Sequence, residues 1–200
     1  MGRLLTPALI LASASPQRRA LLRKLKVPFT IAPSLVSERS SEKRPRRLVE
    51  LLARRKALEI SRRHPEAAVL GADTIVVCRG RILGKPRDAA HAFRILKTLN
   101  GRWQRVYTGI AFALDGGRRV VSKVALTRVL ARRLPEERLK AMAGKHLDMA
   151  GAYAVQDKDD PFIARVDGDF DNVVGLPTAE VRALWKKAVV ARRRSGSEAS

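Results

Sequence analysis

The sequence predicts an α/β protein built around a mixed β-sheet, and three patterns support this prediction. In the first half of the chain, short apolar runs typical of buried strands alternate with longer amphipathic segments typical of helices. Two long strand candidates, residues 105–114 and 118–130, then flank Asp115-Gly116-Gly117, which is typical of a β-hairpin turn. Alternating strands and helices favour parallel pairing, whereas a hairpin is antiparallel, so we expect a mixed sheet.

The elements of the N-terminal half follow from local signals. Ser15 can cap a helix whose first residue is Pro16, and Pro28 ends the pattern. Apolar residues recur at helical spacing over residues 48–63. In chain order we expect a strand at 9–12, a helix at 16–25, a strand at 29–32, a mobile loop at 36–47, a helix at 48–63 and a strand at 69–77.

The C-terminal half begins with a turn at Gly80 and a short return strand, after which Asp88 should cap a helix that Asn100-Gly101 ends. Beyond the hairpin we expect a helix at 135–143, a strand-rich stretch at 153–166, a turn at 167–169 and a helix at 178–192. No repeat or linker divides the chain. We therefore predict one domain with two lobes over residues 1–191, followed by a basic, disordered tail at 192–200.

The composition indicates a globular protein, since 46% of the residues are apolar and 30% are charged. No apolar stretch reaches the roughly 18 to 20 residues of a membrane-spanning helix. Cys78 is the one cysteine, so an intramolecular disulfide is excluded. We expect a cytoplasmic protein without a membrane partner.

The net charge of +22 has two interpretations. It can attract a polyanion, either a nucleic acid or a phosphorylated small molecule. It can also belong to an arginine-rich, solvated surface. With only 4% aromatic residues a base-stacking platform is hard to build, which favours the second interpretation. A nucleic-acid-binding regulator is nevertheless the main alternative to an enzyme.

Residues 13–19 lie between the first strand and the first helix, a place where backbone N–H groups and the helix dipole favour an anion. Ser13, Ser15 and Arg18 would add side-chain donors to phosphate oxygens. An ordinary helix cap with solvated arginines explains the same residues equally well.

Asp73 is the strongest single candidate for catalysis, because it stands inside the apolar run of residues 69–77. A buried carboxylate is costly unless it is paired or holds a metal. The alternative is an Asp satisfied by backbone donors. Lys85 follows the return strand and can point back toward the same site, or it can belong to a plain surface turn.

Eleven short motifs, taken together, extend over most of the chain. They are LASASP (11–16), LA and KA (52–53 and 56–57), GADT (71–74), LGKP (83–86), LNGR (99–102), YTG (107–109), LD (147–148), GAYAVQ (151–156), GD (168–169) and VGLP (174–177). In their order and spacing they resemble the Maf family of nucleoside triphosphate pyrophosphatases, from residue 9 to about residue 185.

The resemblance implies a fold similar to the inosine-triphosphatase-like architecture, with an elongated mixed sheet flanked by helices and two lobes around a central cleft. It implies hydrolysis of a ribo- or deoxyribonucleoside triphosphate, dTTP and UTP or a modified nucleotide, to the monophosphate and pyrophosphate. Such an activity would serve nucleotide-pool housekeeping or the control of cell division. A divalent cation, Mg²⁺ or Mn²⁺, and a homodimer are also implied, and no nucleic acid is required.

By the same resemblance Asp73 matches the family's proton acceptor. Thr74 and Gln156 match positions that distinguish the branch preferring dTTP and UTP, and Gln17 stands where that branch usually has Arg. Trp103 also departs from the family pattern, which commonly has a small residue there.

We therefore hypothesise that Asp73 and Glu38 hold the metal, or that Asp73 deprotonates the attacking water. Arg18, Lys56 and Lys85 would neutralise charge on the leaving pyrophosphate. Ser13, Ser15, Gln17, Thr74 and Gln156 would bind the substrate. A nucleotide sensor that kept the site without catalysis remains a further alternative.

Overall fold

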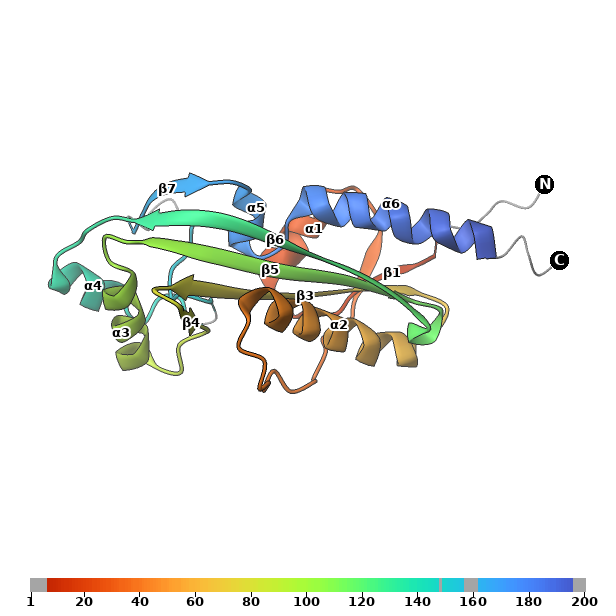
Figure 1. Ribbon diagram of the computed structural model, residues 1–200, viewed down its shortest axis with the longest axis horizontal. Coiled ribbons are helices and arrows are strands. Elements are labelled where there is room, and N and C mark those ends of the chain that lie inside the picture. Colours follow the sequence, from red (N-terminus) through yellow and green to blue (C-terminus); the bar gives the residue numbers. More distant parts are fainter. Residues whose placement is uncertain (1–6, 148, 157–161, 196–200) are drawn as a thin grey trace. The chain divides into compact units, whose positions relative to one another are not determined.

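A computed structural model describes residues 7–147, 149–156 and 162–195, with the side chains described as far as residue 188. Within these residues, seven strands form one sheet in the order β2-β1-β3-β5-β6-β7, with β4 paired to β3 (Figure 1). The strands are β1 (Leu9–Leu11), β2 (Phe29–Ile31), β3 (Ala68–Cys78), β4 (Arg81–Leu83), β5 (Trp103–Leu114), β6 (Arg119–Ala131) and β7 (Ile163–Asp167). β1 pairs in parallel with β2 and β3, whereas β3 with β4 and β6 with β7 are antiparallel. The predicted mixed α/β sheet is confirmed.

The helices also follow the predicted order. They are α1 (Pro16–Arg23), α2 (Pro45–Arg63), α3 (Ala89–Leu99), α4 (Glu136–Met142), α5 (Phe170–Val174) and α6 (Thr178–Ser195), with a 3₁₀ turn, η1 (Asp115–Gly117), in the hairpin. Both predicted N-caps are present: Ser15 Oγ accepts from Arg18 N at 3.4 Å, and Asp88 Oδ1 accepts from His91 N at 2.6 Å. Among the described residues, no helix is both long and apolar enough to cross a membrane.

Four predictions of local structure need correction. α1 ends at Arg23, earlier than expected. α2 begins at Pro45, inside the expected loop, because proline is well tolerated in the first turn of a helix. The stretch 153–166 is not strand-rich: β7 begins only at Ile163, and residues 157–161 lie outside the described part. α6 continues to Ser195, so the predicted disordered tail is helical at its start.

The chain divides into two compact units, which are described separately. The first unit comprises Met1–Asp73, Gly109–Val124 and Leu176–Ser200, and the second comprises Thr74–Thr108 and Ala125–Gly175. Strands β3, β5 and β6 contribute residues to both units. A single domain over residues 1–191 stays a prediction.

The core of the first unit forms where α2 packs on the sheet (Figure 1). Small residues of α2, Ala53 and Ala57, contact Val69 of β3 and its neighbours, and all are fully buried. Gly71 of β3 permits this close approach, because an added Cβ would overlap the carbonyl oxygen of Ala53 and lie 2.7 Å from Ala57 N. The absence of a side chain at position 71 therefore sets the distance between helix and sheet.

Gly71→Ala should consequently destabilise the protein by about 3 kcal/mol, because the clash is with backbone that can move only if the whole helix moves. Chemical denaturation measures the change. Gly84→Ala is the matched control, since no atom lies within 4 Å of a Cβ added there, and its free energy of unfolding should stay close to that of the wild type. Equal effects of the two substitutions would contradict this account of the packing.

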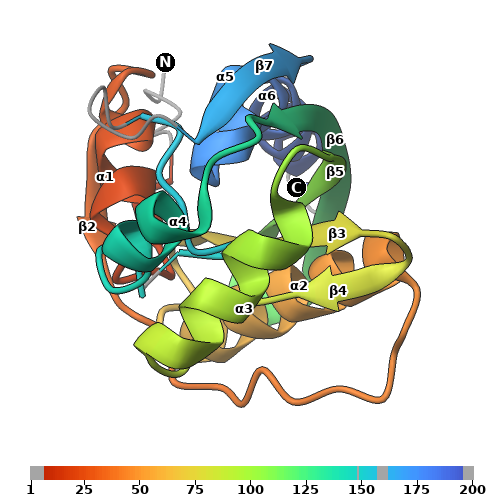
Figure 2. The ribbon, with the colours of Figure 1, turned by 90° about the vertical axis from the view of Figure 1, so that its left-hand side faces the viewer.

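The core of the second unit lies between its part of the sheet and the helices α3 and α4, which lie side by side in Figure 2. Leu96 and Leu99 of α3 and Leu139 of α4 are buried there against Val106 of β5 and Val129 of β6. Because side chains alternate along a strand, the residues between these positions project from the opposite face of the sheet.

Candidate functional site

A lysine between two carboxylates forms the centre of the candidate site in the first unit. Lys56 Nζ donates to Asp73 Oδ1 at 2.7 Å and to Glu38 Oε1 at 2.6 Å. Lys56 is 7% exposed and Asp73 6%, whereas the side chain of Glu38 is 55% exposed. The ammonium group thus joins a buried acid to a solvent-facing one. Asp73 is a buried acid with a charged partner, as the sequence led us to expect.

The local sequence explains how Lys56 and Asp73 come to face each other. Lys56 directly precedes Ala57, and it lies on the side of α2 that packs on the sheet. Residues 69, 71 and 73 of β3 share one face of the strand because side chains alternate. Since Gly71 lets α2 approach closely, Asp73 at the next position of that face meets the lysine.

Burial raises the pKa of Asp73 above its ordinary value, and the negative charge of Glu38 adds to this effect. The charges of Lys56 and Arg18, and the hydrogen bond from Lys56, oppose it without cancelling it. Burial also lowers the pKa of Arg18, against the attraction of Asp73 and Glu38. A carboxylate with a raised pKa is a better proton acceptor near neutral pH than an ordinary one.

The loop before α1 brings together four of the predicted residues. Arg18 Nη1 donates to Ser13 Oγ at 3.4 Å, and the backbone N–H of Ser15 donates to the same oxygen at 3.3 Å. Ser15 Oγ donates to Gln17 Oε1 at 2.8 Å. The arrangement is a helix cap, and it also collects hydroxyl, amide and guanidinium groups at the N-terminus of an eight-residue helix.

In the second unit, Thr74 belongs to a network of buried and half-buried polar groups. Thr74 Oγ1 lies 3.0 Å from Thr108 Oγ1, and Thr108 Oγ1 donates to the backbone oxygen of Asn172 at 3.1 Å. Either hydroxyl can be the donor between Thr74 and Thr108, whereas the carbonyl of Asn172 only accepts. Asn172 Nδ2 continues the network to Thr127 Oγ1 at 3.0 Å and to the backbone oxygen of Val106 at 3.2 Å.

Sequence reasoning assigned Thr108 no role beyond its place in the YTG motif, and it singled out neither Thr127 nor Asn172. The signal available was one threonine inside each of the strands β5 and β6, which by itself does not indicate a partner. α5, which carries Asn172, was not predicted at all.

Lys85 and Gln156 also lie in the second unit, and both side chains are exposed. Gln156 Nε2 donates to Met149 Sδ at 3.7 Å. The N–H of Gly151 donates to the backbone oxygen of Gly84 at 3.2 Å, so the structure does bring the GKP turn next to the GAYAVQ motif. The catalytic role of Lys85 and the substrate-binding role of Gln156 stay predictions.

A divalent cation would have two carboxylates available, those of Asp73 and Glu38. Among the described residues no group of three or more His, Cys, Asp or Glu could form a complete metal site. Mg²⁺ commonly uses one or two carboxylates, with waters and substrate phosphates as its other ligands. The two acids that share Lys56 therefore fit such an ion, although the ligand set itself stays a prediction.

Known proteins resemble this chain over most of its length. The family model described as Maf-like protein matches residues 8–188. The dTTP/UTP pyrophosphatase of Elusimicrobium minutum is 47% identical, covering 84% of this chain and 92% of the relative. The dTTP/UTP pyrophosphatases of Moorella thermoacetica and Myxococcus xanthus are 45% and 44% identical, covering 88% and 90% of this chain and 92% of each relative.

Among solved structures, a HAM1 protein from Coxiella burnetii aligns with a TM-score of 0.44 and 17% identity, over 65% of this chain and 75% of that one. The family assignment rests instead on the sequence relatives and on the family model. Since the family model matches almost all of the described residues and these relatives exceed 40% identity, the chain belongs to the family of Maf-like proteins.

Proposed function

We propose that this chain hydrolyses a nucleoside triphosphate to the monophosphate and pyrophosphate, with dTTP and UTP as preferred substrates. The observation that carries the proposal is the buried carboxylate of Asp73. It is paired with Lys56, and the positive charge of Arg18 also acts on its pKa. Relatives above 40% identity are named dTTP/UTP pyrophosphatases, which supports both the reaction and the substrates.

Asp73 takes a proton from the water that attacks the α-phosphorus, while the bond from that phosphorus to the bridging oxygen breaks and pyrophosphate leaves. Its raised pKa suits this role. When Asp73 is protonated, Glu38 remains as the anionic partner of Lys56, so the buried ammonium is not left unpaired. Lys56, Arg18 and Lys85 offset the negative charge that develops on the leaving group.

Ser13 would donate to phosphate oxygens at the start of α1, and Ser15 would do so once its hydroxyl leaves Gln17 Oε1, to which it donates in this structure. In the alternative role, Asp73 and Glu38 would hold Mg²⁺ or Mn²⁺, which would supply electrostatic stabilisation of the phosphates, and Asp73 would then not take the proton. Gln17 offers only a neutral amide where the pyrimidine branch of the family usually has Arg, so its contact to the substrate is weaker than that of a guanidinium group.

We place Thr74 at the N3–H group of a pyrimidine base, because a hydroxyl oxygen can accept a hydrogen bond from such a donor. Thymine and uracil share an edge on which one N–H donor lies between two carbonyl oxygens. Thr74 would accept from that N–H, and the amide of Gln156 would donate to one of the carbonyls.

We also infer a cytoplasmic homodimer that needs no nucleic acid for catalysis. The buried thiol of Cys78 agrees with a reducing compartment. The dimer follows from the family resemblance alone.

A panel of canonical and modified triphosphates, with identification of the products, tests the proposal. We expect a monophosphate and pyrophosphate, with dTTP and UTP hydrolysed most efficiently. Release of inorganic phosphate would contradict the reaction. Binding without any product would instead indicate a nucleotide sensor.

A further inference from the structure

An exposed sheet face in the second unit carries aromatic and basic side chains that the proposed reaction does not use. It is formed by the outward residues of β5, β6 and β7, which are adjacent strands of the sheet (Figure 2). The outward residues include two leucines, Leu126 and Leu130, of which Leu126 is 44% exposed. The aromatic and charged ones, which we call the outer face, are Trp103, Arg105, Tyr107, Arg128, Arg165 and Asp167. Residues 104, 106, 127 and 129, at the alternate positions, are buried on the core side.

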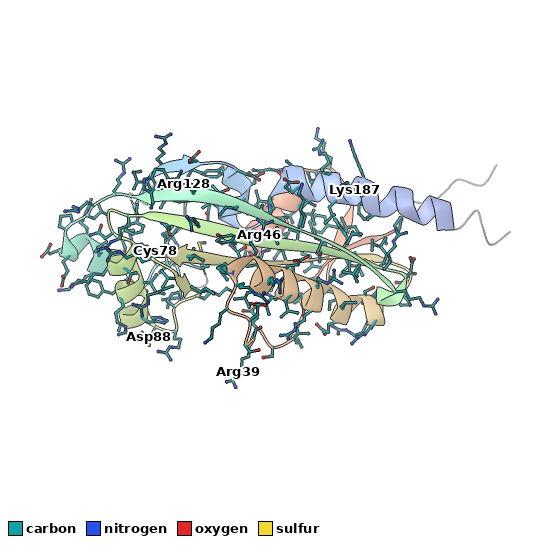
Figure 3. The ribbon with its side chains drawn as sticks, viewed as in Figure 1. Arg39, Arg46, Cys78, Asp88, Arg128 and Lys187 are labelled. Atoms are coloured by element: carbon teal, nitrogen blue, oxygen red, sulfur yellow. The ribbon has the colours of Figure 1, made fainter. Side chains whose placement is uncertain are left out.

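The side chains of the outer face contact one another across the strands. The guanidinium carbon of Arg128, labelled on β6 in Figure 3, lies 4.6 Å from the centre of the Trp103 ring, and Arg128 Nη1 lies 3.5 Å from Asp167 Oδ2. β6 pairs with β7 so that Arg128 lies opposite Asp167 and Leu130 opposite Arg165. Trp103 is 39% exposed, so it remains accessible to solvent although Arg128 lies over its ring.

The charge of this face favours a polyanion. Arg105, Arg128 and Arg165 outweigh Asp167, and the whole chain has a net charge of +22 that would attract an anionic strand. A second copy of the chain fits poorly, because a two-fold interface on this face would bury three arginines of each copy with only Asp167 of each to offset their charge. An aromatic ring and guanidinium planes on an exposed sheet are the groups on which unpaired bases stack.

We propose that the outer face binds single-stranded RNA. Bases stack on Trp103 and Tyr107, and Arg105 and Arg165 contact phosphates. Asp167 supplies a hydrogen-bond acceptor on the outer face. Its carboxylate can accept from the ribose 2′-hydroxyl, a donor that RNA has and DNA lacks. A double helix keeps its bases stacked on each other, so it cannot use the aromatic rings. This interaction lies beyond the proposed hydrolysis and requires none of its residues.

Fluorescence anisotropy with a labelled oligoadenylate tests the proposal on the full chain, since adenine is not the proposed substrate base. Trp103→Ala should weaken RNA binding about tenfold, whereas Trp103→Phe, which keeps an aromatic ring, should stay within about twofold of the wild type. Arg165→Ala should reduce the slope of log Kd against log salt concentration by about 0.7. Arg138→Ala removes the same charge from the exposed surface of α4 and should leave that slope nearly unchanged.

Pyrophosphate release from dTTP should be the same in all four variants, and excess dTTP should not displace the oligoadenylate. Melting curves show whether each variant is folded. The proposal is overturned if Trp103→Ala binds RNA like the wild type, or if Arg138→Ala has the effect of Arg165→Ala. It is equally overturned if the matching DNA strand or an RNA duplex binds more tightly, if dTTP competes, or if Trp103→Ala abolishes a dimer without changing RNA affinity.

Discussion

Asp73→Asn should reduce the turnover of dTTP by about 10²- to 10⁴-fold, the range expected when a general base is lost. An amide has nearly the shape of the carboxylate but cannot take a proton from water. The variant should fold, because Lys56 keeps Glu38 as its ion-pair partner and a costly buried charge is removed. The measurement is pyrophosphate release at saturating dTTP and Mg²⁺.

Asp88→Asn is the matched control for that substitution. Asp88 caps α3 through its hydrogen bond to His91 N, and asparagine caps helices about as well, so both stability and turnover should remain close to the wild type. Turnover of Asp73→Asn near the wild-type rate would show that another group accepts the proton. In that case the proposed chemistry would have to be reassigned.

Lys56→Met should destabilise the protein by about 3 to 5 kcal/mol at neutral pH, because it leaves the carboxylate of Asp73 buried without its counter-ion. Methionine has a similar length and flexibility, so little packing is lost. Urea denaturation measures the change. In the double variant Lys56→Met/Asp73→Asn the unpaired charge is gone, and most of the lost stability should return. If the losses of unfolding free energy in the two single variants simply add in the double variant, the pairing is contradicted.

The loss in Lys56→Met should also depend on pH. Since the pKa of Asp73 is raised in the folded chain, the folded state binds a proton more readily than the unfolded one. The stability contributed by this group is therefore complete below its ordinary pKa of 3.8 and is lost as the pH rises through the raised value. Without Lys56 the pKa rises further, so the deficit of the variant should shrink as the pH falls through this window. A deficit independent of pH would be inconsistent with an unpaired Asp73.

Local signals in the sequence predicted several features well. Ser15 and Asp88 cap helices as expected, because a cap depends on the few residues that follow it. The hairpin between β5 and β6 was recognised from its turn residues. The error at residues 153–166 has a comparable cause: the apolar side chains there suggested a strand, but Tyr153 is instead buried against Phe162 in a turn region, where Ala152 has a φ of 61°.

The sequence by itself determined the α/β class, the membership of the Maf-like family and the identity of Asp73 as an acid within an apolar strand. These follow from periodicity, local turn chemistry and ordered motifs, each of which is written in short segments of the chain. The tertiary structure alone decided that Lys56, 17 residues from Asp73 and 18 from Glu38, joins the two acids. It also decided that the hydroxyls of Thr74 and Thr108 lie within hydrogen-bonding distance and that Trp103 lies beside Arg128. Such contacts depend on how closely a helix docks on a sheet and on the register between strands, which no local pattern encodes.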